Sequence, residues 1–186
     1  MSVRGLTRAA LLAAAALIMF VIEAQFPHPI PIPGLKLGLA NIIIVYAVYA
    51  VGHKQAFAVL CSKIVLGSIL AGGGIGFWYS AAGGLLCFCV MLLMRHVLSH
   101  GQIWVCSVLG AVAHNTGQIL MAVFLMRTAY VLAYLPFLLA SGLVSGLVTG
   151  LAAQAVHKRL VRHLRTSAIL IASEKSQTTD FSLRSK

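Results

Sequence analysis

One histidine, three amides and two lysines lie in stretches of this 186-residue sequence that contain few other polar side chains. Amides and imidazole form directed hydrogen bonds, and an ammonium group attracts negative charge. A polar group in apolar surroundings is costly unless it has a partner, so each of these side chains is a candidate for binding a ligand. The candidate substrate-binding residues are Lys36, Asn41, Lys63, His114, Asn115 and Gln118.

The densest group of polar side chains lies between residues 107 and 121. One face of a helix through this segment carries Ser107, Gly110, His114, Gln118 and Met121. Asn115 flanks that face, so three bulky polar groups need partners inside the protein at membrane depth. A lone histidine there is typical of a structural role, whereas a cluster beside small residues favours a binding pocket.

Lys63 lies near the middle of an apolar stretch between residues 56 and 72. A cation at that depth is energetically costly, so we expect its side chain to face the interior of the protein or a wet cavity. Two interpretations stay open. Lys63 forms an ion pair with Glu23, the only carboxylate within the apolar region, or it attracts an anionic ligand.

Four of the five prolines fall between residues 27 and 33, and proline at alternate positions produces a stiff extended segment. This segment is either a rigid spacer or a lid over a site that opens on the outer side of a membrane. The residues assigned to the lid are Phe26, His28, Pro31, Pro33 and Gly34. Lys36 follows directly and is either an interfacial anchor or a ligand group, and Asn41 lies one to two helical turns further along.

The composition excludes several classes of function. Hydrophobic residues make up 60% of the chain and charged residues 9%, and the mean hydropathy is +0.97, which argues against a soluble domain. Glu23, Glu174 and Asp180 are the only carboxylates, too few for a paired-carboxylate hydrolase or an Asp-rich magnesium site. The four cysteines form no CxxC pair and no nucleotide-binding motif occurs, so we expect no metal, no cofactor and no enzyme activity.

The apolar stretches predict an all-α polytopic membrane protein, a bundle of six transmembrane helices, because each span needs about 20 apolar residues. The predicted spans are residues 6–26, 35–52, 56–72, 76–95, 103–126 and 131–156. The glycine cluster at residues 72–76 is the strongest break between them. Residues 1–157 then form the transmembrane domain, and residues 158–186 form a basic, flexible cytoplasmic tail.

The lysines and arginines sit mostly at the edges of these spans. With the N-terminus inside, eight of them fall on the cytoplasmic side and two, Lys36 and Arg127, on the outer side. The positive-inside rule therefore predicts a multi-pass protein of the cell (plasma) membrane with both termini in the cytoplasm. The same distribution explains the net charge of +11 by contacts with the lipid bilayer and not by nucleic-acid binding.

Small residues recur at helical spacing in two of the spans. Gly142, Gly146 and Gly150 predict close packing of the last span against another helix. A smooth surface on the first span is formed by Ala9, Ala10, Ala13 and Ala14. This surface either packs within the bundle or docks onto a separate membrane subunit.

Three motifs resemble a small membrane family that is called both the Gx transporter family and heptaprenyl diphosphate synthase component I. That family is similar to the substrate-binding (S) components of energy-coupling factor transporters. The motifs are PGLKLGLAN at residues 33–41, SAAGG at residues 80–84 and GAVAHNTGQ at residues 110–118, and the resemblance extends over residues 6–156. Family members often carry arginine at the position of Lys63, and the two residues are not interchangeable where an anion is held by two parallel bonds.

The resemblance implies a six-helix component that captures a vitamin-like or other small molecule from outside. It implies a transmembrane coupling subunit and two cytoplasmic ATPase subunits as partners, which hydrolyse ATP in place of this chain. Residues 26–34 would then be the lid, and residues 9–14 would meet the coupling subunit. The alternative is a non-catalytic membrane component associated with heptaprenyl diphosphate synthesis, since the catalytic subunits need Asp-rich motifs and this chain has one Asp.

The predicted topology is testable with reporter fusions. Green fluorescent protein fused to the C-terminus is expected to fluoresce, because that end stays in the cytoplasm. Alkaline phosphatase inserted after Arg127 is expected to be active, and phosphatase inserted after Lys54 or Arg95 inactive. Phosphatase activity at Lys54 or Arg95 would contradict the predicted orientation.

Overall fold

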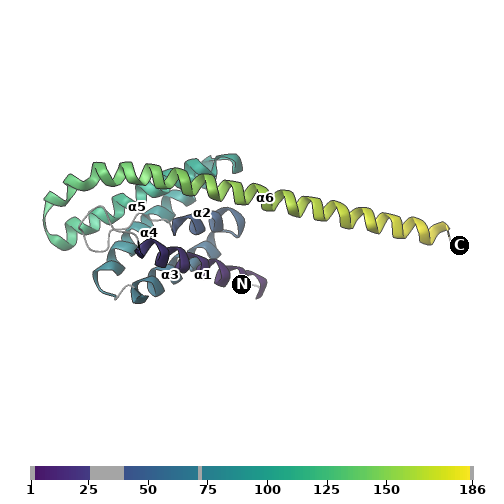
Figure 1. Ribbon diagram of the computed structural model, residues 1–186, viewed down its shortest axis with the longest axis horizontal. Helices are drawn as coiled ribbons and strands as arrows, with labels where there is room; N and C mark the ends of the chain where they lie inside the picture. Colours follow the sequence, from purple (N-terminus) through teal and green to yellow (C-terminus); the bar gives the residue numbers. More distant parts are fainter. Residues whose placement is uncertain (1–2, 26–39, 71–72, 185–186) are drawn as a thin grey trace. The chain divides into compact units, whose positions relative to one another are not determined.

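The computed structural model describes residues 3–25, 40–70 and 73–184, and the regular structure among them is helical, as the sequence predicts. The helices are α1 (Val3–Gln25), α2 (Asn41–Ala50), α3 (His53–Leu70), α4 (Ile75–Val97), α5 (Ile103–Met126) and α6 (Leu135–Arg184). Two short 3-10 segments, η1 (His100–Gln102) and η2 (Ala129–Tyr134), precede α5 and α6. Figure 1 shows these elements coloured along the chain.

The helices follow the predicted apolar stretches. α5 has the bounds predicted from the sequence, and α4 starts and ends within two residues of its prediction. α2 begins at Asn41, and residues 35–39 of the predicted second span lie outside the described residues. α6 continues to Arg184, well past the predicted end at residue 156, because no glycine or proline follows Gly150 to interrupt it. Residues 158–184, which the sequence predicts to be a basic, flexible tail, are therefore helical.

The chain divides into two units, Met1–Gln154 and Ala155–Lys186. The second unit is the C-terminal part of α6, on which Lys158, Arg159 and Arg162 are exposed. The first unit contains α1 to α5 and α6 up to Gln154. The core and the candidate site both belong to the first unit.

Four helical segments of the described chain are long and apolar enough to cross a membrane, as expected for a membrane protein. They are Gly5–Gln25, Ile75–Val97, Ile103–Met126 and Ala129–Leu160. α2 has only 10 residues, and α3 carries a polar first turn and Lys63. These two helices therefore differ from the other four in length or polarity.

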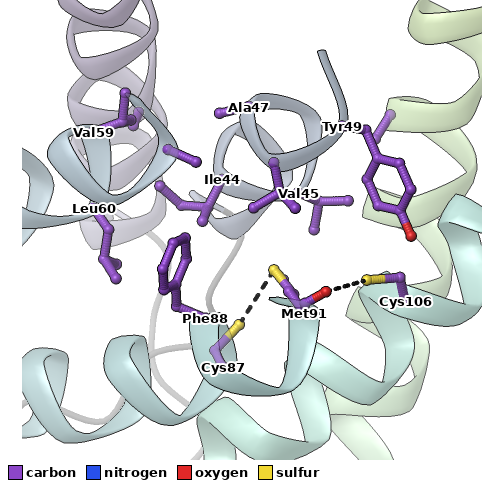
Figure 2. Packing of buried hydrophobic residues seen from close by; sticks show 14 of the residues in the cluster. Ile44, Val45, Ala47, Tyr49, Val59, Leu60, Cys87, Phe88, Met91 and Cys106 are labelled. Carbon is purple, nitrogen blue, oxygen red and sulfur yellow. Dashed lines mark hydrogen bonds between the residues drawn. The ribbon is translucent and has the colours of Figure 1, made fainter. Parts of the chain in front are cut away.

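The core of the first unit is built mainly from α2, α3, α4 and α5, with buried alanines of α1 and α6 at its edge. Figure 2 shows Ile44 and Val45 of α2 pointing toward Phe88 and Met91 of α4, with the thiol of Cys106 reaching over from α5. The Cys106 thiol donates to the Met91 carbonyl oxygen at 3.8 Å. Cys87 and Cys106 are free thiols buried in this core, where they pack as small apolar residues.

Close helix contacts through glycine bring α4 and α5 side by side (Figure 1). A Cβ atom at Gly117 of α5 would lie 2.7 Å from the Ala82 carbonyl oxygen of α4, and one at Gly83 of α4 would lie 2.8 Å from the His114 carbonyl oxygen. Neither position has room for a larger side chain, because backbone atoms of the facing helix occupy the space. The two glycines therefore set the distance between α4 and α5.

The opposite side of α5 packs against α6 in the same way. A Cβ atom at Gly146 would lie 2.9 Å from Val108 Cα, and one at Gly150 would lie 2.7 Å from Trp104 Cα. Ser107 and Thr149 share a hydrogen bond of 3.1 Å across this contact. The close packing predicted for the small residues of the last span is confirmed, and its partner is α5.

The turn between α3 and α4 contains the predicted glycine break. Gly73 and Gly74 have φ angles of 68° and 70°, a left-handed backbone that glycine adopts without strain. α3 ends at Leu70 and α4 begins at Ile75 on either side of this turn. The cluster therefore separates two helices within one long uncharged stretch, as the sequence indicates.

The glycine contact between α4 and α5 predicts a difference between two alanine substitutions. Gly117→Ala is expected to lower the free energy of unfolding by about 1–3 kcal/mol, because the added methyl group meets backbone atoms that cannot move aside. Gly76→Ala is the control, since nothing lies within 4 Å of a Cβ atom there, and it is expected to be neutral or slightly stabilising. Denaturant unfolding in detergent measures both, and equal stabilities would contradict the role of Gly117.

Candidate functional site

Lys63 lies in the interior of the first unit, as the sequence predicts. Its side chain is 4% exposed, and its Nζ donates a hydrogen bond of 3.0 Å to Asn41 Oδ1. The contact joins α3 to the first residue of α2. An ammonium group has three donors and this bond uses one of them, so the lysine keeps the capacity to bind a further acceptor.

Glu23 of α1 is also buried, at 3% exposure, and its carboxylate has a favourable Coulomb interaction with Lys63. The hydrogen bond described for the Lys63 ammonium nevertheless goes to Asn41. Burying a partly neutralised lysine in an apolar bundle costs less free energy than burying an isolated one, and its ammonium group still attracts negative charge. The two interpretations of Lys63, ion pairing and anion attraction, are therefore compatible.

His114 and Gln118 lie one helical turn apart on α5 and face α4 at Gly83. A Cβ atom at Gly83 would lie 2.9 Å from His114 Nδ1 and 2.8 Å from Gln118 Cγ. Both side chains are buried, at 3% and 1% exposure. The charge of Lys63 acts on the His114 imidazole, so the groups of α3 and α5 share one electrostatic environment. Glycine at position 83 leaves the space that the two polar side chains fill.

We refer to Glu23, Asn41, Lys63, His114 and Gln118 as the Lys63 cluster. Three of its buried polar atoms have no hydrogen-bond partner among the described residues: Asn41 Nδ2, His114 Nδ1 and Gln118 Oε1. Native proteins pair nearly all buried polar atoms, because an unpaired one costs about 1–3 kcal/mol. A donor on α2 and two ring or amide atoms on α5 are thus buried without described partners in the cluster that contains the Lys63 cation.

Asn115 lies apart from the cluster. Its Nδ2 donates to the Leu138 carbonyl oxygen of α6 at 2.6 Å. Adjacent residues on a helix differ in direction by about 100°, so Asn115 faces α6 while His114 faces α4. The sequence predicts Asn115 as a substrate-binding residue, and the hydrogen bond shows that it also joins α5 to α6.

The structure describes some of the predicted site residues and not others. Lys36 and the lid segment, with Phe26, His28, Pro31, Pro33 and Gly34, lie outside the described residues. In the predicted docking surface, Ala9 and Ala13 are buried in the bundle core, whereas Ala10 and Ala14 are exposed. A smooth outer surface on α1 therefore contains at most the second pair, because α1 turns the first pair inward.

Two members of the site were not in the predicted substrate-binding set. The sequence predicts Glu23 only as an ion-pair partner of Lys63. A single carboxylate in an apolar helix by itself indicates a residue of a functional site. Gly83 belongs to the SAAGG motif at residues 80–84, and only its position opposite His114 and Gln118 shows that it makes room for them. Two cavities bounded by described residues lie elsewhere, one beside His53 and one beside Phe137.

Comparison with known families finds a match over most of the chain. The model of the family described as heptaprenyl diphosphate synthase component I matches residues 12–156. That range contains the whole Lys63 cluster and ends close to the boundary of the first unit. A search of curated proteins gave no match.

The hydrogen bond between Lys63 and Asn41 predicts coupled effects on stability. Asn41→Leu is expected to lower the free energy of unfolding by about 2 kcal/mol, because the ammonium group stays buried and loses its described partner. Lys63→Met in the same background is expected to recover most of that loss, since no charge then remains to be solvated. Unfolding of both variants in detergent is the measurement, and additive losses in the double variant would show that the two residues are not coupled.

Proposed function

The chain belongs to the heptaprenyl diphosphate synthase component I family, and we propose that it is the substrate-binding membrane (S) component of an energy-coupling factor type transporter. In this role it captures a small vitamin-like or anionic molecule from outside for uptake. The observation that carries the proposal is the Lys63 cluster, in which a buried cation accompanies buried polar atoms that have no hydrogen-bond partner among the described residues. Such an arrangement costs free energy in the empty protein and is offset when a ligand completes the hydrogen bonds.

The chemistry of the cluster favours a ligand with an anionic or carbonyl group and at least one donor. Lys63 attracts the negative charge, and the remaining amide proton donors of Asn41 bind an acceptor. Gln118 Oε1 accepts from a donor on the same molecule, and His114 helps to orient it. We expect Lys36 to add a second positive charge and the segment 26–34 to close over the site.

The proposed topology is a bundle of six transmembrane helices in the plasma membrane with both termini in the cytoplasm. Four helices have the length and hydropathy of membrane spans, and α2 and α3 complete the bundle around them. The excess of lysine and arginine on one side supports the orientation. In this arrangement the polar side chains of α2 and α3 face the protein interior and the ligand.

Energy for uptake comes from partners in this proposal. The sequence contains no nucleotide-binding motif, so two cytoplasmic ATPase subunits bind and hydrolyse ATP, and a transmembrane coupling subunit connects them to this chain. Ala10 and Ala14, the exposed alanines of α1, offer a smooth surface on which the coupling subunit can pack closely. The chain itself is neither an enzyme nor a holder of a cofactor.

The family description favours a second candidate, a non-catalytic membrane component associated with heptaprenyl diphosphate synthesis. A prenyltransferase holds the diphosphate through magnesium and Asp-rich motifs, and the single Asp of this chain is Asp180. The chain would therefore recruit or stimulate a separate catalytic subunit. This candidate explains the family description, and the transporter component explains the unpaired buried groups.

Native mass spectrometry of the gently solubilised protein shows whether a small molecule is bound and which partner proteins co-purify. The wild-type chain is expected to retain a small molecule, and Lys63→Met and Gln118→Leu are expected to reduce its occupancy about tenfold or more. Thr116→Val is the matched control on the same helix, because the Thr116 hydroxyl bonds only its own helix at the Val112 carbonyl. Equal ligand occupancy in all four proteins would contradict the proposed site.

The partners that co-purify discriminate between the two candidates. A coupling subunit with two ATPases is the result expected for a transporter component. A soluble Asp-rich prenyltransferase, stimulated by addition of the chain, is the result expected for a synthase component and would overturn the transport proposal.

A further inference from the structure

A second polar site lies away from the Lys63 cluster, where the start of α3 meets the C-terminal end of α4. It is a cavity of about 460 Å³ lined by His53, Leu92, Arg95 and His96. The volume lies within the range of about 300–1,000 Å³ that small-molecule sites occupy. The lining combines three basic side chains with one apolar wall, and none of the four residues belongs to the proposed transport site.

The charges around this cavity all have the same sign. Arg95 is a permanent cation and forms no hydrogen bond or ion pair with any described residue. Glu23 is the only carboxylate whose side chain the structure describes, and it lies in the Lys63 cluster. The positive charge of the cavity therefore has no described counter-charge in the protein.

The backbone adds to this positive potential. His53 is the first residue of α3, an 18-residue helix whose first N–H groups have no partners within the helix. The preceding Gly52, at a φ of 112°, turns the chain so that α3 starts beside the cavity. The N-terminal end of a helix carries a partial positive charge, and together with Arg95 it favours an anion.

One histidine of the cavity is held in a defined orientation. His96 Nδ1 donates to the Leu92 carbonyl oxygen at 2.7 Å, which leaves Nε2 as the ring nitrogen for another partner. Basic residues in the last turn of α4 also complement the dipole of that helix, which accounts for Arg95 and His96 by themselves. It does not account for His53, which approaches the same cavity from a different helix.

We propose that this cavity binds a phosphate-bearing anion, with Arg95 as its main ligand and His53 and His96 beside it. Arginine forms two parallel hydrogen bonds to phosphate oxygens, and the start of α3 supplies backbone donors. The phosphate belongs either to a free anion or to the headgroup of an anionic lipid, for which Leu92 offers an apolar contact. The site is independent of the proposed transport function.

Two binding measurements on the full-length protein test this proposal and identify the source of the phosphate. In the first, inorganic phosphate is titrated by calorimetry into protein held in phosphatidylcholine nanodiscs. In the second, native mass spectrometry compares retention of phosphatidylglycerol and phosphatidylcholine added in equal amounts. Wild-type protein is expected to bind inorganic phosphate or to prefer phosphatidylglycerol. Binding of inorganic phosphate identifies a free anion as the ligand, and a preference for phosphatidylglycerol identifies a lipid headgroup.

Arg95→Gln is expected to weaken the observed binding about tenfold or more, because it removes the charge and the paired hydrogen bonds. Arg127→Gln is the matched control, since it removes the same charge at the C-terminal end of α5 and Arg127 does not line the cavity, and it is expected to bind as the wild type does. His53→Gln gives a second, milder test at an exposed side chain, with a smaller loss expected. Absence of binding in both arms, or equal losses in Arg95→Gln and Arg127→Gln, would overturn the proposal.

Discussion

A lysine ammonium group inside an apolar helix bundle dictates which side chains lie around it. Lys63 is 4% exposed, and its surroundings are arranged to make that burial tolerable. Asn41 accepts a hydrogen bond from it, and Glu23 supplies an opposing charge. These groups come from α1, α2 and α3, so the interactions that stabilise one buried charge also hold three helices together.

The glycine contacts of α4 and α5 place the remaining polar groups beside that charge. Because Gly83 and Gly117 let the two backbones approach closely, His114 and Gln118 fit against α4 without a side chain opposing them. The contact between α5 and α6 uses Gly146 and Gly150 in the same manner. α5 is thus held on both sides by small residues, which fixes the direction in which its polar groups point.

The sequence predicts much of this arrangement and misses the rest for physical reasons. The positions of α4 and α5 follow from long uncharged stretches, and Lys63 stands out because a charge in such a stretch needs a partner. The separation of His114 from Asn115 follows from the helix geometry only once the neighbours on each side are known.

Contacts between distant segments are harder to predict from one sequence. Nothing local indicates that Asn41 is the hydrogen-bond partner of Lys63, or that His53 and Arg95 share a cavity, because each pairing is set by how the helices pack. Residues 158–184 are mostly polar, and polarity by itself does not distinguish a helix from irregular structure. The absence of helix breakers after Gly150 was the better signal.

A high-resolution structure of the protein purified in lipid nanodiscs from its host membrane tests directly whether the buried polar groups bind a small molecule. Density for a small molecule is expected within hydrogen-bonding distance of Lys63 Nζ and Gln118 Oε1. A cluster without such density, in which Asn41 Nδ2 and Gln118 Oε1 are bonded to other groups of the protein, would contradict such binding.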